Sequence, residues 1–301
     1  MLRLLFTLVF VGLTFNLTGR LFGADKGGNP LLDQAVREQK DGNYKNAFDI
    51  YQKLVVDNQS ETTTVIRSLQ SIPTCLYNLD RIGEIDTVLE QTVTSHQNDW
   101  RVLLEVSKTY QTVQHYGHII GDELTRGHSR GGAQYVNLEE RDRVRALQLL
   151  VQARELMLKD TTAEPDEQGN FYLELAQTIQ MGRSTYESWK MQTLTDLSEL
   201  PEADESNPRF GGYRRWGGGS FQGAPVDNEG NPLVFAVPES WETAASDGER
   251  WRWALAQAAE STKNHLMRVK LQLGDWGQSL FGVQTLQDQP FFYKSISEGK
   301  V

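Results

Sequence analysis

Apolar residues recur at helical spacing through most of the chain, and the clearest example lies between residues 40 and 57. Its apolar positions are three or four residues apart, with mainly polar residues between them: Ala47, Ile50, Tyr51, Leu54 and Val55. This spacing places the apolar side chains along one face of an α-helix. Because a single helix cannot bury such a stripe alone, the pattern predicts packing against neighbouring helices.

The same stretch carries the spacing of a helical repeat. Gly42, Tyr44 and Ala47 match the second half of a tetratricopeptide repeat, where a small residue lets paired helices approach closely. A weaker copy of the pattern begins at Gly83, 41 positions later, against a usual period of about 34 residues. We therefore expect a mainly α-helical fold, with a tetratricopeptide-like array of helical pairs over residues 25–200.

Other helix signals in this region support the array. Asp99 can cap one helix, a strong helical pattern runs from 138 to 159, and Pro165 can open the next helix. Apolar residues between 186 and 197 predict a helix that pairs with the one beginning at Pro165. Cys75 lies in an apolar setting, SIPTCLYNL, which favours a buried thiol over a reactive one.

A Gly-rich insertion at 117–136 interrupts the helical pattern between two of these helices. Insertions in helical arrays tend to lie on one face, and long ordered loops tend to be functional. Arg126 and Arg130 lie in this insertion, close to Arg141 and Arg143 in the next helix. These arginines either bind a phosphate or carboxylate of a partner or form internal ion pairs with the neighbouring acids. Arg126 and Arg130 are therefore candidate partner-binding residues.

Residues 201–240 form a second irregular segment, rich in Gly, Pro and aromatic residues. Two short strands around a turn at 228–231 are expected here, so the segment is predicted to carry a short β-hairpin. Pro225 and Pro232 confine such strands to sheet edges or strand starts. Trp216 is one of several large rings in the segment and is a candidate partner-binding residue.

Residues 241–301 predict a helical pair followed by an apolar tail. Trp251 and Trp253 lie on one helix, two positions apart, so we expect one to face the core and Trp253 to mark a contact surface. Phe291 and Phe292 lie in the tail. Large rings at a chain end either cap the array or dock a partner, so both residues are candidates for partner binding.

The first 24 residues are typical of a secretory signal peptide. Arg3 precedes an apolar run from 4 to 17, and small residues come just before Asp25. The run is shorter than the roughly 20 apolar residues that span a membrane. An extracytoplasmic location is therefore expected, with membrane contact only through an uncleaved segment.

The charge of the chain narrows the choice of partner. The net charge is −10, and removal of residues 1–24 takes away two arginines and no acid, which makes it −12. An acidic chain repels nucleic acid and favours cationic partners.

The sequence gives little support for a catalytic or metal-binding site. The His and acidic residues between 115 and 128 lack a specific metal-binding spacing, and no P-loop, GxSxG or HExxH pattern occurs. We therefore expect no catalytic residues, metal or cofactor, and a protein that is not an enzyme. One alternative stays open, an extracytoplasmic hydrolase or metal-dependent enzyme whose site lies in the Gly-rich segments.

Three blocks of sequence together resemble a narrower family. They are TRGHSRGG with ERDRVRALQLL, then GAPVDNEGNPLVFAVP, then DGERWRWALAQAAE with FGVQTL. In order and length they are similar to the N-terminal region of large exported bacterial proteins related to alpha-2-macroglobulin. The resemblance covers most of residues 30–290.

This resemblance implies a helical, repeat-like region that precedes macroglobulin-type β-sandwich domains in assemblies associated with protease trapping. The matched residues are scaffold positions, and Cys75 is not in a CxEQ thioester setting. Trapping activity is therefore not expected of this chain. The implied function is a non-catalytic protein-interaction scaffold, whose partner is a macroglobulin-like domain or a protease.

Overall fold

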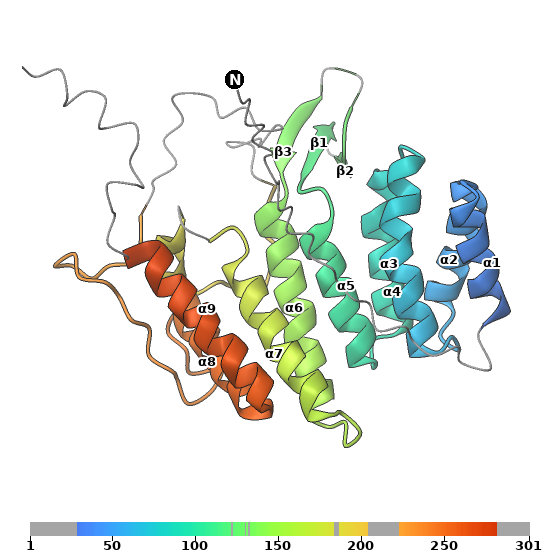
Figure 1. Cartoon of the computed structure of the whole chain (residues 1–301). Helices are drawn as coiled ribbons and strands as arrows, with labels where there is room; N and C mark the ends of the chain where they lie inside the picture. Colours follow the sequence, from blue (N-terminus) through green and yellow to red (C-terminus); the bar gives the residue numbers. More distant parts are fainter. Residues whose placement is uncertain are drawn as a thin grey trace, which may run out of the picture.

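The computed structural model describes residues 29–121, 123–129, 131, 133–183, 187–203 and 223–281. Within these residues the chain is mainly helical, with nine α-helices and one small antiparallel sheet (Figure 1). The helices are α1 (Pro30–Lys40), α2 (Tyr44–Val56), α3 (Thr62–Asn78), α4 (Ile85–Ser95), α5 (Trp100–Thr112), α6 (Glu139–Met157), α7 (Pro165–Gln180), α8 (Asp247–Ser261) and α9 (Lys263–Phe281). The expected mainly α-helical fold class is thus confirmed.

The helices pack in chain order. Each one packs mainly on helices one or two places before or after it, as α1 does on α2, α5 on α6, and α7 on α8. The contacts α3–α5, α5–α7 and α7–α9 place the odd-numbered helices in one layer. In Figure 1 the series runs from α1 at the right to α9 at the left. One hydrophobic core runs through the whole series of helices, from Leu32 in α1 to Val269 in α9.

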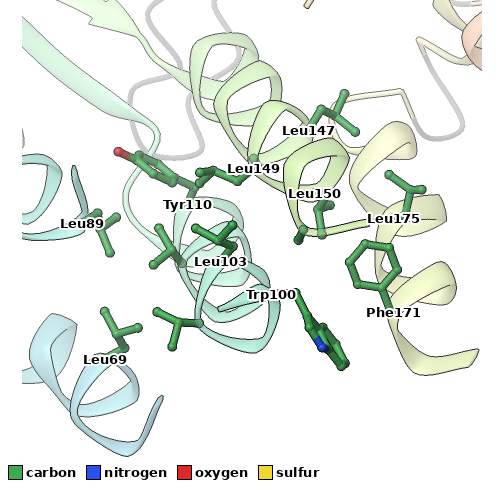
Figure 2. Packing of buried hydrophobic residues seen from close by; sticks show 14 of the residues in the cluster. Leu69, Leu89, Trp100, Leu103, Tyr110, Leu147, Leu149, Leu150, Phe171 and Leu175 are labelled. Carbon is green, nitrogen blue, oxygen red and sulfur yellow. The ribbon is translucent and has the colours of Figure 1, made fainter. Parts of the chain in front are cut away.

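Figure 2 shows part of this core, in which buried side chains of α5, α6 and α7 such as Leu103, Leu150 and Phe171 lie together. The rings of Trp100 and Phe171 meet edge to face with their centroids 6.1 Å apart. The indole Nε1 of Trp100 donates a hydrogen bond to Asp160 at 2.8 Å, so its polar atom has a partner at the edge of the core. Arrangements of this kind are preferred by aromatic pairs and by buried indole groups.

The helix predicted between residues 40 and 57 is α2. Its side chains at Ala47, Tyr51, Leu54 and Val55 are buried, as the spacing indicated. Gly42 has a φ of +83°, a conformation that favours glycine, and it turns the chain between α1 and α2. The thiol of Cys75 is buried in α3, and burial raises its pKa to about 11.

The Gly-rich insertion forms a sheet. Strands β1 (Tyr116–Ile120), β2 (Glu123–Arg126) and β3 (Gln134–Asn137) pair antiparallel in the order β2–β1–β3. A Cβ atom on Gly117 would lie 2.7 Å from the carbonyl oxygen of Thr125, so this strand position requires glycine. The sheet lies beyond the upper ends of α5 and α6 in Figure 1.

The prediction of a helix at 186–197 is wrong. In the described part of this stretch the chain forms only a short 3₁₀ turn, η2 (Ser188–Gln192), and then continues in irregular conformation. Its backbone is hydrogen-bonded to other segments, for example from Trp189 N to Gly223 O and from Thr195 N to Asp247 Oδ1. Helix α8 takes the place of the predicted partner and packs against α7.

The short β-hairpin predicted within 201–240 is reduced to one bridge between Val226 and Pro232 in the described residues. The turn itself forms, because Asp227 Oδ1 accepts from the backbone N–H groups of Glu229 and Asn231. A proline at 232 has no N–H for a ladder, which explains why no longer strand pair develops. The helical pair expected after 241 forms as α8 and α9, and it extends the series of helices.

The burial of Ala47 leads to a stability prediction. Its side chain is fully buried between packed helices, so Ala47→Trp should lower the free energy of unfolding by roughly 1 to 3 kcal/mol through overpacking. Lys45→Ala is the matched control, since the Lys45 side chain is 69% exposed and its ion pair with Asp49 contributes little. Thermal melts should separate the two variants clearly, and equal shifts would contradict the assigned face.

Candidate functional site

The Gly-rich insertion is fastened to the helices by Arg126. Its buried guanidinium donates to both carboxylate oxygens of Asp142 in α6, at 2.7 and 2.6 Å, and to Asp86 in α4, at 3.0 and 2.8 Å. Burial alone would lower the pKa of Arg126, but the two carboxylates raise it above its ordinary value. The expectation that Arg126 binds a partner is wrong, because its side chain is buried and already paired. Of the two interpretations, internal ion pairing holds for this residue.

The histidines near the sheet do not form a metal site in the described residues. His115 uses both ring nitrogens, with Nδ1 2.7 Å from Asp142 Oδ2 and Nε2 3.1 Å from the Gln111 carbonyl oxygen. His118 Nδ1 lies 3.0 Å from the Gly127 carbonyl oxygen. Among the residues that the structure describes, no group of three or more His, Cys, Asp or Glu side chains could hold a metal ion.

A second buried network of charges surrounds Arg143, the residue that follows Asp142 in α6. Arg143, which is fully buried, lies 3.4 Å from Asp247 at the start of α8 and donates to Glu140 and to Thr195. Arg183 also donates to Glu140, through two bonds of 2.9 Å. Burial tends to raise the pKa of Glu140, but the bonds from Arg183 and Arg143 hold it at about 2. This network fixes the segment at 187–203 and the start of α8 against α6.

Trp253 does not mark a surface. Its side chain is 5% exposed and Trp251 is 1% exposed, so both rings of the helix are buried and the expectation for Trp253 is wrong. Trp253 contacts Tyr172 and Trp241 edge to face, and the Arg154 guanidinium lies 4.8 Å above its ring. The segment before α8 brings Trp241 over this side of the helix. The spacing of apolar residues within one helix cannot predict that Trp241, from another segment, covers Trp253.

The other four candidate partner-binding residues, Arg130, Trp216, Phe291 and Phe292, lie outside the described residues, as does the expected signal segment.

A groove that the sequence did not point to lies between α5 and α7. It has a volume of about 520 Å³ and is lined by Lys108, Gln111, Thr112, Glu174, Gln177, Gln180, Met181 and Gly182. The α7 residues at 174, 177 and 180 recur at a spacing of three, which keeps them near one face of the helix. This row of polar residues on one helix face is the feature of the sequence that could have indicated the groove.

The groove contains hydrogen-bonding groups without a partner in the described chain. Gln177 is exposed and makes no side-chain hydrogen bond with any described residue. Gln111 Nε2 donates to Glu174 at 2.8 Å, and Gln180 Oε1 accepts from Gln272 at 3.5 Å, so each of these amides keeps one polar atom available. Such groups can bind a ligand by hydrogen bonding.

A second hollow, of about 770 Å³, lies along α4 and the end of α2. Its two acids already have partners, since Asp86 pairs with Arg126 and Glu90 pairs with Arg145. Burial tends to raise the pKa of Glu90, but hydrogen bonds from Arg145 and Tyr110 bring it below its ordinary value. The charged groups of this hollow therefore serve the packing of the helices, and the groove between α5 and α7 is the better candidate for ligand binding.

Comparison with known proteins found no matching family model, no matching curated protein and no matching solved structure. In the described part of the chain no helix has the length and apolar character needed to cross a membrane.

The Glu140 network predicts a dependence of stability on pH. The folded-state pKa, about 2, lies below the ordinary value of about 4.3, so this carboxylate stabilises the fold above about pH 4.3 and loses that effect as the pH falls toward 2. Glu140→Gln should therefore lower the melting temperature at pH 7 and approach the wild type between pH 4.3 and 2. Calorimetric melts across this range measure the difference.

Glu155→Gln is the control for this experiment, because Glu155 is an exposed residue of the same helix. It should follow the wild type at every pH. A Glu140→Gln difference that stays constant from pH 7 to pH 2 would contradict the role given to the carboxylate.

Proposed function

We propose that this protein is an exported, non-catalytic scaffold for protein–protein interaction, built as a tetratricopeptide-like array of helical pairs. The observation that carries the proposal is the groove between α5 and α7, in which polar side chains keep unpaired hydrogen-bonding atoms. Side chains whose only role is packing do not require a groove with unpaired hydrogen-bonding atoms, whereas a surface that binds a partner does.

The order of helix contacts supports the repeat-like part of the proposal. In repeat arrays each unit contacts mainly its neighbours, and the surface that results is long and continuous. Here α3, α5, α7 and α9 lie side by side in one layer, and the groove opens between two of them. Gly42 lies in a turn and Ala47 is buried in a helix contact, and both positions support the proposed repeat.

The resemblance to the N-terminal region of bacterial alpha-2-macroglobulin-related proteins gives the proposal its setting. The ERDRVRALQLL block of that resemblance falls on α6, and its Asp142 and Arg143 are the buried charges of the two networks. In this proposal the partner is a macroglobulin-like domain or a protease, and the protein works outside the cytoplasm.

Site-specific photo-crosslinking tests the interaction. Benzoylphenylalanine in place of the exposed Gln177 in the groove should give a discrete heavier adduct in the compartment where the protein is found. The same probe in place of Glu155, on α6, should give none. The measurement is a mass shift on a denaturing gel, followed by mass spectrometry of the adduct. Equal adducts at both positions, or none at position 177, would contradict a partner in the groove.

Export has a separate test. The arginine, the short apolar run and the small residues before Asp25 predict a mature chain that begins near Asp25. N-terminal sequencing of protein recovered from outside the cytoplasm should find this start. Recovery of soluble cytoplasmic protein that retains Met1 would show that the segment is not a cleaved signal.

A further inference from the structure

The stretch from Leu233 to Val237 presents peptide groups that have no hydrogen-bond partner in the chain. It contains neither a helix nor a turn or bend, and in Figure 1 it belongs to the orange loop at the left end of the series. The Leu233 N–H donates to the carbonyl oxygen of Pro225, but the N–H and C=O groups of residues 234–237 bond to no described residue. Such groups are found at the edge of a β-sheet, where a further strand can pair with them.

The side chains of this stretch are also those of an edge strand. Val and Phe are enriched in strands, and they make up three of the five residues in LVFAV. Leu233 and Phe235 pack on the hydrophobic core, whereas Val234 is 82% exposed and Ala236 is exposed as well. This alternation is that of a strand with one buried and one open face.

Phe235 holds the stretch in place. Its ring lies directly against the backbone of α8, since a Cβ atom on Gly248 would lie 2.4 Å from ring atoms of Phe235. Gly248 follows Asp247, which belongs to the buried charge network around Arg143. A partner strand would thus meet an edge that is already ordered, which reduces the entropic cost of binding.

The charges on both sides of the stretch select among partner strands. Between residues 223 and 249 the chain has six acids and no Lys or Arg. Asp227 and Glu229 precede the stretch and Glu239 follows it, and all three are exposed without an ion pair to any described residue. A second copy of this stretch would place acids opposite acids in either direction of pairing, which is destabilising. A strand with Lys or Arg at both ends is attracted instead.

We propose that residues 233–237 bind an extended segment of a partner protein by β-strand addition, and that this segment has β-branched residues between basic residues at its two ends. Peptide groups of alternate residues in a strand point to opposite edges, so those of Val234 and Ala236 point away from Pro225 and pair with the partner. This surface is separate from the groove between α5 and α7, so the inference does not depend on the groove.

The test uses a fluorescein-labelled ten-residue peptide with two Lys at each end and alternating Thr and Val between them. It is titrated with the full chain at 0.15 M salt and followed by anisotropy. Ala236→Pro removes an N–H group of the open edge and should weaken binding roughly tenfold. Ala236→Thr is the matched control, because it keeps the N–H group at the same exposed position, and it should change the affinity less than about threefold.

Two modified peptides test the unmutated chain in the same assay. Methylation of every backbone nitrogen should abolish binding, because the peptide can no longer donate to the carbonyl oxygens of the stretch. Replacement of the four Lys by Glu should weaken binding at least roughly threefold, since the acids beside the stretch repel it.

Three results of these titrations would overturn the inference: equal affinity for the methylated and unmodified peptides, equal affinity of the two Ala236 variants, or no binding of the Lys-ended peptide. A dimer of the unmutated chain that Ala236→Pro dissociates would also overturn it, because the stretch would then pair with a second copy. None of these results changes the meaning of an adduct from position 177, so the proposed scaffold and this inference can fail separately.

Discussion

Two adjacent buried charges on α6 hold the irregular parts of this protein onto its helices. Successive residues of an α-helix point roughly 100° apart, so Asp142 and Arg143 reach in different directions. Asp142 binds Arg126 of β2, and Arg143 lies against Asp247 at the start of α8. Since a buried charge without a partner is strongly unfavourable, each segment has essentially one position in which both charges are satisfied.

This constraint shapes the candidate binding surface. The helices alone would pack by their apolar stripes, which tolerate sliding and repacking to a degree that paired charges do not. Asp142 also contacts His115, whose other nitrogen lies against the Gln111 carbonyl at the end of α5. Gln111 itself lines the groove. The groove edge on α5 is thus tied through one histidine to the same carboxylate that holds the sheet.

Local pattern predicted the helices well. The spacing of Ala47, Tyr51 and Leu54 gave a helix whose apolar face is buried, and Asp99 caps α5 through the backbone N–H groups of Arg101 and Val102. These features depend on residues close in sequence, which is why a single sequence reveals them.

Long-range pairing was not predictable in the same way. Arg126 is buried because it pairs with Asp86 and Asp142, which lie 40 and 16 residues away in the sequence. Nothing near Arg126 in the sequence indicates these partners. Trp253 is covered by Trp241 and Tyr172, which come from another segment and another helix. The helix predicted at 186–197 failed because hydrogen bonds to Gly223 and Asp247 stabilise an irregular backbone there.

Amide hydrogen exchange of Asp142→Asn tests most directly whether the α6 charges fasten the sheet. The substitution removes one charge of a buried pair, so the amides of β1, β2 and β3 should exchange at least roughly tenfold faster than in the wild type, as local opening of about 1.4 kcal/mol requires. The amides of α1 and α2, which do not contact the sheet, should keep their protection. Unchanged protection in the three strands would contradict the account.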